Sequence, residues 1–303
     1  MKRNLSVKLC GKTLANPVIA ASGCFGFGQE MANYYDLNKL GGIALKGITL
    51  EERQGNPPPR IAETPSGMLN SVGLQNPGVK AFKEQEMPRI KDLSTMLFAN
   101  IAGSTVEDYC RVAEELRHTA VDFIEMNISC PNVKEGGAAF GAHPQMIEDI
   151  TRQVKKHCKQ PLIVKLSPNT VDIANNAKAA EQGGADGISL INTLIGMAVD
   201  VRTRKPILGN VIGGLSGPAI RPVALRMVWQ AAKAVDIPVI GMGGIMTGED
   251  AISFLMAGAT AVMVGSLNLI DPEGCLDVIN GIEKFMIEEG IEDINHIIDT
   301  LEV

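Results

Sequence analysis

The chain has 303 residues, of which 45% are hydrophobic and 20% are charged, and its formal net charge is −6. This composition suits a chain that buries a full core, and it excludes intrinsic disorder, which needs low hydrophobicity and high charge. The acidic balance and the lack of a basic cluster argue against a nucleic-acid partner.

No membrane span or intrinsic metal site is expected. The longest uncharged apolar stretch, residues 187–199, falls short of the ~18 residues that a membrane helix needs. Lys8 and Lys12 interrupt the region where a signal peptide would carry its apolar segment. The six cysteines and four histidines are scattered, without the close spacing of disulfide scaffolds, zinc sites or iron–sulfur sites. We therefore expect a cytoplasmic protein with no membrane partner.

Taken in chain order, short β-branched runs alternate with helical patterns. A hairpin is expected at residues 5–14, and eight strands at residues 17–21, 42–45, 95–99, 123–126, 162–165, 187–191, 238–241 and 261–264. Helices are expected at residues 106–118, 145–157, 171–182, 222–234 and 249–256. Long loops are expected at residues 49–78, after the second strand, and at residues 199–217, after the sixth. This alternation predicts βαβ units around a parallel sheet.

Eight such units predict an α/β fold of the (β/α)8 TIM-barrel type, as a single domain over residues 1–303. The N-terminal hairpin would precede the barrel, and the long loops would lie at its C-terminal rim. A doubly wound open sheet is the alternative.

The active site of such a barrel lies at the C-terminal ends of its strands. Most of the predicted ends carry polar side chains, and the last two carry glycines: Ser22, Lys46, Asn100, Asn127, Lys165, Asn192 with Thr193, Gly243 with Gly244, and Gly265 with Ser266. The set is short of the paired carboxylates that glycosidases use. A lysine there can hold an anion or form a Schiff base, or it can simply reach to solvent. The side-chain amides of Asn70, Asn100, Asn127 and Asn192 offer both hydrogen-bond donors and acceptors, which suits a ligand ring with alternating C=O and N–H groups.

The glycines after the last two strands predict a phosphate site. Glycine lets backbone N–H groups approach an oxyanion, and a helix expected to start near Thr247 would favour its negative charge. Plain turn glycines are the alternative. Gly241 and Gly243 resemble the start of a dinucleotide fingerprint, but Met246 stands where its third glycine should be. A Rossmann NAD site is therefore disfavoured.

Cys130 lies just past the fourth strand, in a loop that also holds Gly136 and Gly137. An ordinary thiol pKa near 8.5 suits acid–base chemistry at mild pH. The other five cysteines are expected to be inert thiols.

Seven motifs then occur in order, at residues 16–23, 70–77, 127–132, 164–168, 192–193, 213–217 and 241–244. Together they resemble a dihydroorotate dehydrogenase over essentially the whole chain. Cys130, where other members have serine, resembles the class 1 enzymes. Residues 133–141 resemble the type B, NAD-linked catalytic subunit rather than the fumarate-linked type A.

The resemblance implies one FMN per chain at the barrel mouth, with its phosphate on the predicted glycine site. The implied flavin contacts are Ser22, Lys46, Gly47, Asn100, Asn127, Lys165, Ile191, Gly217, Gly243, Gly244, Gly265 and Ser266. Lys165 would face the pyrimidine edge of the flavin. The implied substrate contacts are Lys46, Asn70, Ser71, Val72, Gly73, Leu74, Asn127, Asn192 and Thr193, with Asn132 a further candidate.

The implied reaction is the oxidation of (S)-dihydroorotate to orotate in pyrimidine (UMP) biosynthesis. Cys130 would take the C5 proton as thiolate, while hydride leaves C6 for N5 of the flavin. Electrons would reach NAD⁺ through a partner subunit that carries FAD and a [2Fe–2S] cluster, in an assembly of two catalytic and two electron-transfer chains.

The sequence leaves three alternative functions open. A dihydropyrimidine dehydrogenase-like flavoenzyme would share the cysteine loop and the asparagines, but Lys46 favours a substrate with a carboxylate. A Schiff-base aldolase would use Lys165. A non-catalytic barrel that binds a phosphate ligand would have no need of Cys130.

Overall fold

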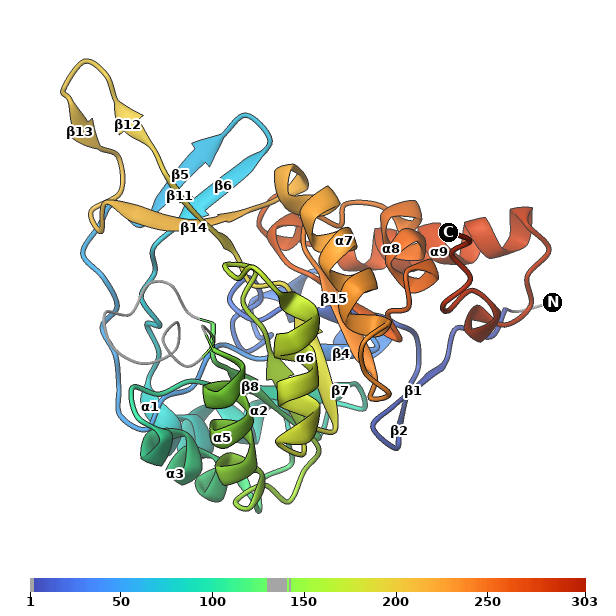
Figure 1. Cartoon of the computed structure of the whole chain (residues 1–303), viewed down its shortest axis with the longest axis horizontal. Coiled ribbons are helices and arrows are strands. Elements are labelled where there is room, and N and C mark those ends of the chain that lie inside the picture. The colour runs from blue at the N-terminus through green and yellow to red at the C-terminus, as the bar shows by residue number, and fades with distance from the viewer. Residues whose placement is uncertain (1–2, 130–140, 142) are drawn as a thin grey trace.

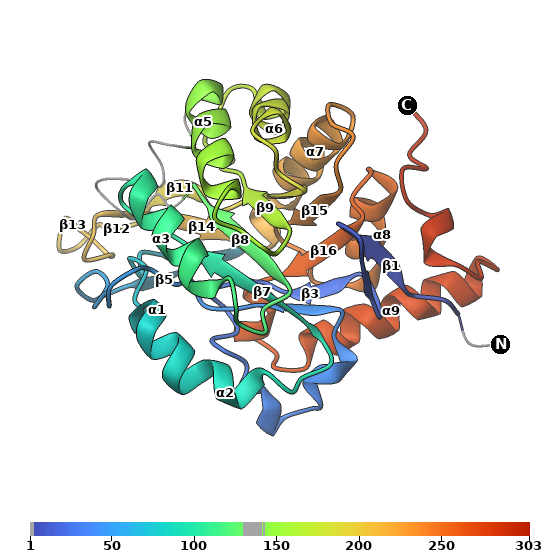
Figure 2. The same ribbon diagram turned by 90° about the horizontal axis from the view of Figure 1, so that it is seen from below.

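The computed structural model describes residues 3–129, 141 and 143–303. In this part of the chain, eight parallel strands close into a barrel in chain order (Figures 1 and 2). They are β3 (Val18–Ala20), β4 (Gly42–Ala44), β7 (Met96–Ile101), β8 (Phe123–Asn127), β9 (Leu162–Lys165), β10 (Gly187–Leu190), β15 (Val239–Met242) and β16 (Ala261–Val264). Each overlaps one of the eight predicted strands. The closed barrel confirms the predicted fold and rules out the open sheet.

The barrel strands are apolar runs because both of their faces are covered. In β9, β10, β15 and β16 every residue is buried. Phe98 and Phe123 face each other across β7 and β8, with ring centroids 4.4 Å apart. The barrel strands therefore form a tightly packed, mainly apolar core.

Helices surround the barrel, as Figure 2 shows. They are α1 (Gly78–Ala81), a π-helical turn η3 (Phe82–Glu86), α2 (Met87–Ile90), α3 (Val106–Leu116), α5 (Pro144–Lys155), α6 (Ile173–Gln182), α7 (Arg221–Ala232), α8 (Gly248–Met256) and α9 (Gly274–Glu288). The five predicted helices correspond to α3, α5, α6, α7 and α8. The start of α8 follows a capping box in which Thr247 and Asp250 bond each other's backbone N–H groups.

Two helical segments were not predicted. The first, from α1 to α2, begins at Gly78 and contains Pro88, so its sequence resembles a loop. The second, α9, has no side-chain cap and carries Gly281 in its interior. A Cβ atom on Gly281 would lie 3.0 Å from the Cα of Gly248. The glycine that weakens the local helical signal therefore allows α9 to pack closely against α8.

The two long loops fold into antiparallel strands, contrary to the prediction. A four-stranded sheet has the order β11 (Leu194–Met197), β14 (Ile212–Ser216), β6 (Gly67–Asn70), β5 (Ile61–Thr64). A hairpin of β12 (Val199–Asp200) and β13 (Lys205–Pro206) projects beyond it (Figure 1). The pairing of β6 with β14 joins segments more than a hundred residues apart in the sequence, which local patterns do not report.

The predicted N-terminal hairpin is present as β1 (Val7–Leu9) and β2 (Lys12–Leu14). Both views place it on the side of the barrel away from the four-stranded sheet (Figures 1 and 2). Short 3-10 helices complete the chain: η1 (Met31–Asn33), η2 (Leu37–Lys39), η4 (Pro218–Ile220), η5 (Ser266–Leu269) and η6 (Ile294–His296). Within the described ranges, no helix is long and apolar enough to cross a membrane.

Candidate active site

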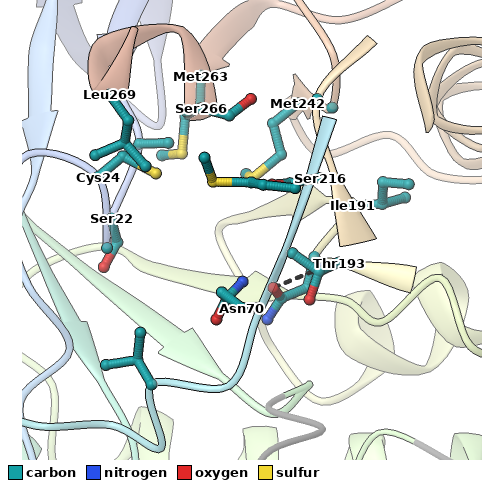
Figure 3. A pocket seen from close by; sticks show the side chains of 18 of the residues that line it. Ser22, Cys24, Asn70, Ile191, Thr193, Ser216, Met242, Met263, Ser266 and Leu269 are labelled. Atoms are coloured by element: carbon teal, nitrogen blue, oxygen red, sulfur yellow. Dashed lines mark hydrogen bonds between the residues drawn. The ribbon is translucent and has the colours of Figure 1, made fainter. Parts of the chain in front are cut away.

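A cavity of about 1240 Å³, partly open to solvent, lies at the C-terminal ends of the barrel strands, beside the four-stranded sheet. Figure 3 shows side chains from many separate segments converging on it, among them Ser22, Asn70, Thr193 and Ser266. The cavity therefore collects residues that the sequence keeps far apart.

Nearly all the predicted site residues line this cavity. They are Ser22, Lys46, Gly47, Asn70, Val72, Gly73, Leu74, Asn100, Asn127, Lys165, Ile191, Asn192, Thr193, Gly217, Gly243, Gly244, Gly265 and Ser266. Ser71 is not among the lining residues. Its side chain is fully buried, and its hydroxyl has no hydrogen-bond partner. Cys130 and Asn132 lie outside the described residues, as does most of the segment with type B character.

The asparagines at the ends of β8 and β10 are held by a shared network. The Asn192 side-chain amide donates to the Ser129 hydroxyl at 2.7 Å and lies 3.4 Å from Asn127 Oδ1. The Ser129 hydroxyl donates to the same Asn127 oxygen at 2.9 Å. The Tyr109 hydroxyl donates to the Asn127 backbone carbonyl at 2.7 Å. These contacts preorganise two amides at the cavity wall.

A neighbouring part of the wall comes from the four-stranded sheet that is added to the barrel (the added sheet). Asn70 on β6 donates to the Gly214 carbonyl on β14 at 3.3 Å, and the two residues are register partners. Thr193 is held by the Asn192 side chain, which accepts from its backbone N–H at 2.8 Å, and by Asn169, which donates to its carbonyl at 3.1 Å. The sheet thus completes a polar pocket that the barrel alone would leave open.

A glycine cradle is formed by Gly243, Gly244 and Gly265, which follow the last two barrel strands, and by Gly217, which follows β14. Gly217, Gly243 and Gly244 have φ values of +98°, +131° and +71°, in the region that favours glycine. A Cβ atom on Gly244 would lie 2.7 Å from the Gly217 carbonyl oxygen. At Gly265, a Cβ atom would have no neighbour closer than 3.7 Å. The cradle is therefore tight where its strands meet and open toward the cavity.

Lys46, Lys165 and Cys24 are the titratable side chains among the described residues that line the cavity. Lys165 is only 5% exposed, and Lys46 is half-buried. Burial raises the pKa of the Cys24 thiol, and the nearby Lys165 and Lys46 ammonium groups oppose this rise. At neutral pH this thiol is protonated, while the two ammonium groups make the cavity suitable for an anionic ligand.

Several lining residues were not predicted. They include Cys24 and a mostly apolar set formed by Ile61, Met68, Ser216, Ile220, Met242, Ile245, Met263 and Leu269. Figure 3 shows Met242, Met263 and Leu269 on the side of the cavity that also holds Cys24 and Ser266. Apolar side chains at strand ends look like core residues in a sequence. Only their position at the ends of β15 and β16 could have marked Met242 and Met263.

Across the described ranges, no group of three or more His, Cys, Asp or Glu side chains is placed to hold a metal ion. The described cysteines are free thiols.

Residues 4–286 match the model of the family described as dihydroorotate dehydrogenase. The chain is 58% identical over 296 residues to the dihydroorotate dehydrogenase B (NAD(+)), catalytic subunit, of Alkaliphilus metalliredigens, covering 98% of both chains. It is 52% identical over 301 residues to the subunit of that name from Bacteroides fragilis, covering 99% of both. Among solved structures, DHODH of Eimeria tenella in complex with ferulenol matches with a TM-score of 0.83 and 22% identity. That match covers 98% of this chain and 88% of the other, and it supports the barrel fold.

Proposed function

Because this chain belongs to the dihydroorotate dehydrogenase family, we propose that it oxidises (S)-dihydroorotate to orotate in pyrimidine biosynthesis, as the catalytic subunit of the NAD-linked type. It would do so as a single FMN-binding barrel domain over residues 1–303. The observation that carries this proposal is the meeting of a glycine cradle, two lysines and a set of asparagines in one cavity. The glycine cradle would suit a phosphate, and the lysines and asparagines would suit the flavin ring and the substrate carboxylate.

The cavity fits FMN. The cradle would offer backbone N–H groups to a phosphate, and Gly265 leaves open the space that a Cβ atom would occupy. Lys165 and Asn100, at the ends of β9 and β7, supply a cation and an amide for the polar edge of the ring. We assign to this cofactor Ser22, Lys46, Gly47, Asn100, Asn127, Lys165, Ile191, Gly217, Gly243, Gly244, Gly265 and Ser266. When bound, FMN supplies the hydride acceptor for the reaction.

The substrate site is proposed on the side of the cavity nearer the added sheet. Lys46 would neutralise the carboxylate of dihydroorotate, and the amides of Asn70, Asn127 and Asn192 would pair with the pyrimidine ring. Thr193 and residues 72–74 complete this wall. Since the Ser71 side chain is buried away from the cavity, any contact that Ser71 makes with substrate would be through its backbone.

Cys130 is the proposed base, although it lies outside the described residues. It would remove the proton from C5 of dihydroorotate as a thiolate. The hydride on C6 then leaves, so that a double bond forms between the two carbons and orotate results. The described residues would contribute by holding the substrate ring and its carboxylate in position for removal of the C5 proton and of the C6 hydride.

A partner subunit is proposed from the names of the relatives, which are called catalytic subunits. We propose that this partner carries FAD and a [2Fe–2S] cluster and passes electrons to NAD⁺. We further propose a heterotetramer of two catalytic and two electron-transfer chains. The chain alone should therefore reduce NAD⁺ poorly, and efficient reduction without a partner would contradict the proposal.

The flavin absorbance tests the activity. The purified chain should be yellow, and anaerobic dihydroorotate should bleach it. Cys130→Ala should keep the colour and lose nearly all bleaching, whereas Cys110→Ala, which changes a thiol on α3, should bleach normally. A protein that cannot be loaded with FMN, or a Cys130→Ala variant that bleaches at the normal rate, would refute the proposal.

A further inference from the structure

One fully buried carboxylate, that of Glu125 on β8, lies next to the cavity without lining it. Its Oε2 accepts from the Asn100 side-chain amide at 2.5 Å, and its Oε1 accepts from the Ser189 hydroxyl at 2.7 Å. Lys165 Nζ lies 3.8 Å from Oε2. In the described part of the chain, Glu125 and Lys165 are the buried side chains that carry a formal charge.

The barrel register brings these groups together. Asn100 and Glu125 are partners across β7 and β8, and Lys165 and Ser189 are partners across β9 and β10. The four strands are adjacent in the barrel. A buried carboxylate is costly unless it is paired and hydrogen-bonded. Here it has two donors and one cation, so the network is satisfied at the boundary between the core and the cavity.

The geometry has two consequences for the cavity wall. The Asn100 NH₂ group donates to Glu125, so the Asn100 carbonyl oxygen faces elsewhere. That oxygen would lie 3.2 Å from a Cβ atom on Gly47, another residue of the cavity wall. At 3.8 Å, Lys165 is within ion-pair range but beyond hydrogen-bond distance. Its N–H groups are thus not bonded to Glu125.

We propose that Glu125 is a positioning residue for flavin chemistry, holding the Lys165 ammonium at the cavity wall and turning the Asn100 carbonyl toward the cavity. This inference rests on the proposed FMN site. A cation beside the flavin ring stabilises the negative charge that the ring acquires on reduction. Without Glu125, no other buried acidic side chain among the described residues would hold the buried Lys165 ammonium in this place. The other titratable groups that face the pair from the cavity are Lys46 and Cys24.

The reduction potential of bound FMN, measured from pH 6 to 9, tests this role. Glu125→Gln keeps the shape of the side chain and removes its charge. Its potential should fall toward that of Lys165→Met, because the cation is no longer held at the flavin, whereas the wild-type potential should stay above that of Lys165→Met at every pH. The double variant should match Lys165→Met. Ser189→Ala removes a hydrogen bond of the same network without changing charge, and it should follow the wild type. A Glu125→Gln potential that follows the wild type at every pH would overturn the proposal.

A second readout needs no flavin. Trace acetylation of the FMN-free full chain by acetic anhydride, mapped by mass spectrometry, reports the neutral-amine fraction of each lysine. Lys165 should label at least about 10-fold faster in Glu125→Gln than in the wild type at pH 7.5, because the ion pair with Glu125 that favours the charged ammonium is lost. Equal labelling also counts against the role of Glu125. If the wild type binds FMN but dihydroorotate fails to bleach it, the proposed function fails while both readouts still decide the role of Glu125.

Discussion

Gly214 and Thr193 lie so close together that a Cβ atom on Gly214 would come within 2.6 Å of the Thr193 Cβ. Rotating the Thr193 side chain would not relieve this contact, because its Cβ does not move with the rotation. Gly214 lies on β14 of the added sheet, and Thr193 follows β10 of the barrel. This contact sets how closely the sheet approaches the barrel on the proposed substrate side of the cavity.

Gly214→Ala should therefore destabilise the protein. Overpacking costs about 1–3 kcal/mol, which corresponds to a fall in Tm of roughly 2–5 °C for a chain of this size. The measurement is thermal unfolding followed by circular dichroism. Adding Thr193→Gly to Gly214→Ala removes the opposing Cβ and should recover part of the lost Tm. Equal Tm values for Gly214→Ala and the wild type would show that the two segments separate freely.

Gly265→Ala should weaken FMN binding with little loss of folding stability. Its Cβ would meet no atom closer than 3.7 Å, so the Tm of the FMN-free protein should fall by no more than about 2 °C. The added methyl group would project into the glycine cradle, and FMN affinity measured by fluorescence quenching should fall at least about 10-fold, the equivalent of 1.4 kcal/mol.

Gly274→Ala is the converse control. Its Cβ would lie 2.5 Å from Leu267 Cγ, and Gly274 does not line the cavity. It should lower the Tm and leave the FMN affinity of the folded protein close to that of the wild type. If Gly265→Ala binds FMN normally, the cradle is not where the phosphate lies.

Lys46→Met should lower kcat/KM for dihydroorotate, because it removes the cation proposed to bind the substrate carboxylate. A hydrogen bond to a charged group contributes about 1.5–3 kcal/mol, so kcat/KM should fall roughly 10- to 150-fold. The FMN content, read from absorbance, should be checked in the same sample. Lys80→Met, at an exposed position on α1, is the matched control and should be unchanged. An unaltered kcat/KM in Lys46→Met would remove Lys46 from the substrate site.

The buried thiol of Cys275 predicts a loss of stability at alkaline pH. Its Sγ donates to Asn268 Oδ1 at 3.2 Å, and burial raises its pKa from 9.0 to about 12. The unfolded chain loses this proton above pH 9 while the folded chain keeps it, so unfolding becomes more favourable as the pH rises from 9 to about 12. Below pH 9 the thiol is protonated in both states and contributes no pH dependence.

Urea unfolding midpoints at pH 8, 9.5 and 10.5 measure this effect. Wild-type stability should fall more steeply with pH than that of Cys275→Ala, by up to about 1.4 kcal/mol per pH unit. The other alkaline groups titrate in both proteins, so the difference in slope isolates this thiol. Parallel slopes would contradict the raised pKa.

Sequence alone determined the barrel and most of the candidate site. The eight strands could be predicted because a parallel strand covered on both faces is a continuous apolar run. Polar residues such as Lys165 and Asn127 then stand out where those runs end. The barrel topology carries all such ends to one rim, so knowing the strands nearly suffices to know the site. The role of Cys130 stays a prediction, because it lies outside the described residues.

The tertiary structure decided what depends on contacts between distant segments. The pairing of β6 with β14 turned two predicted loops into a wall of the cavity. The same structure buried Ser71 while its neighbours Asn70 and Val72 line the cavity. Glu125 could not be singled out from the sequence, since an acidic residue within a strand gives no sign of its partners. Its burial between Asn100, Ser189 and Lys165 exists only once the barrel closes, because hydrogen bonds and desolvation depend on neighbours in space rather than in sequence.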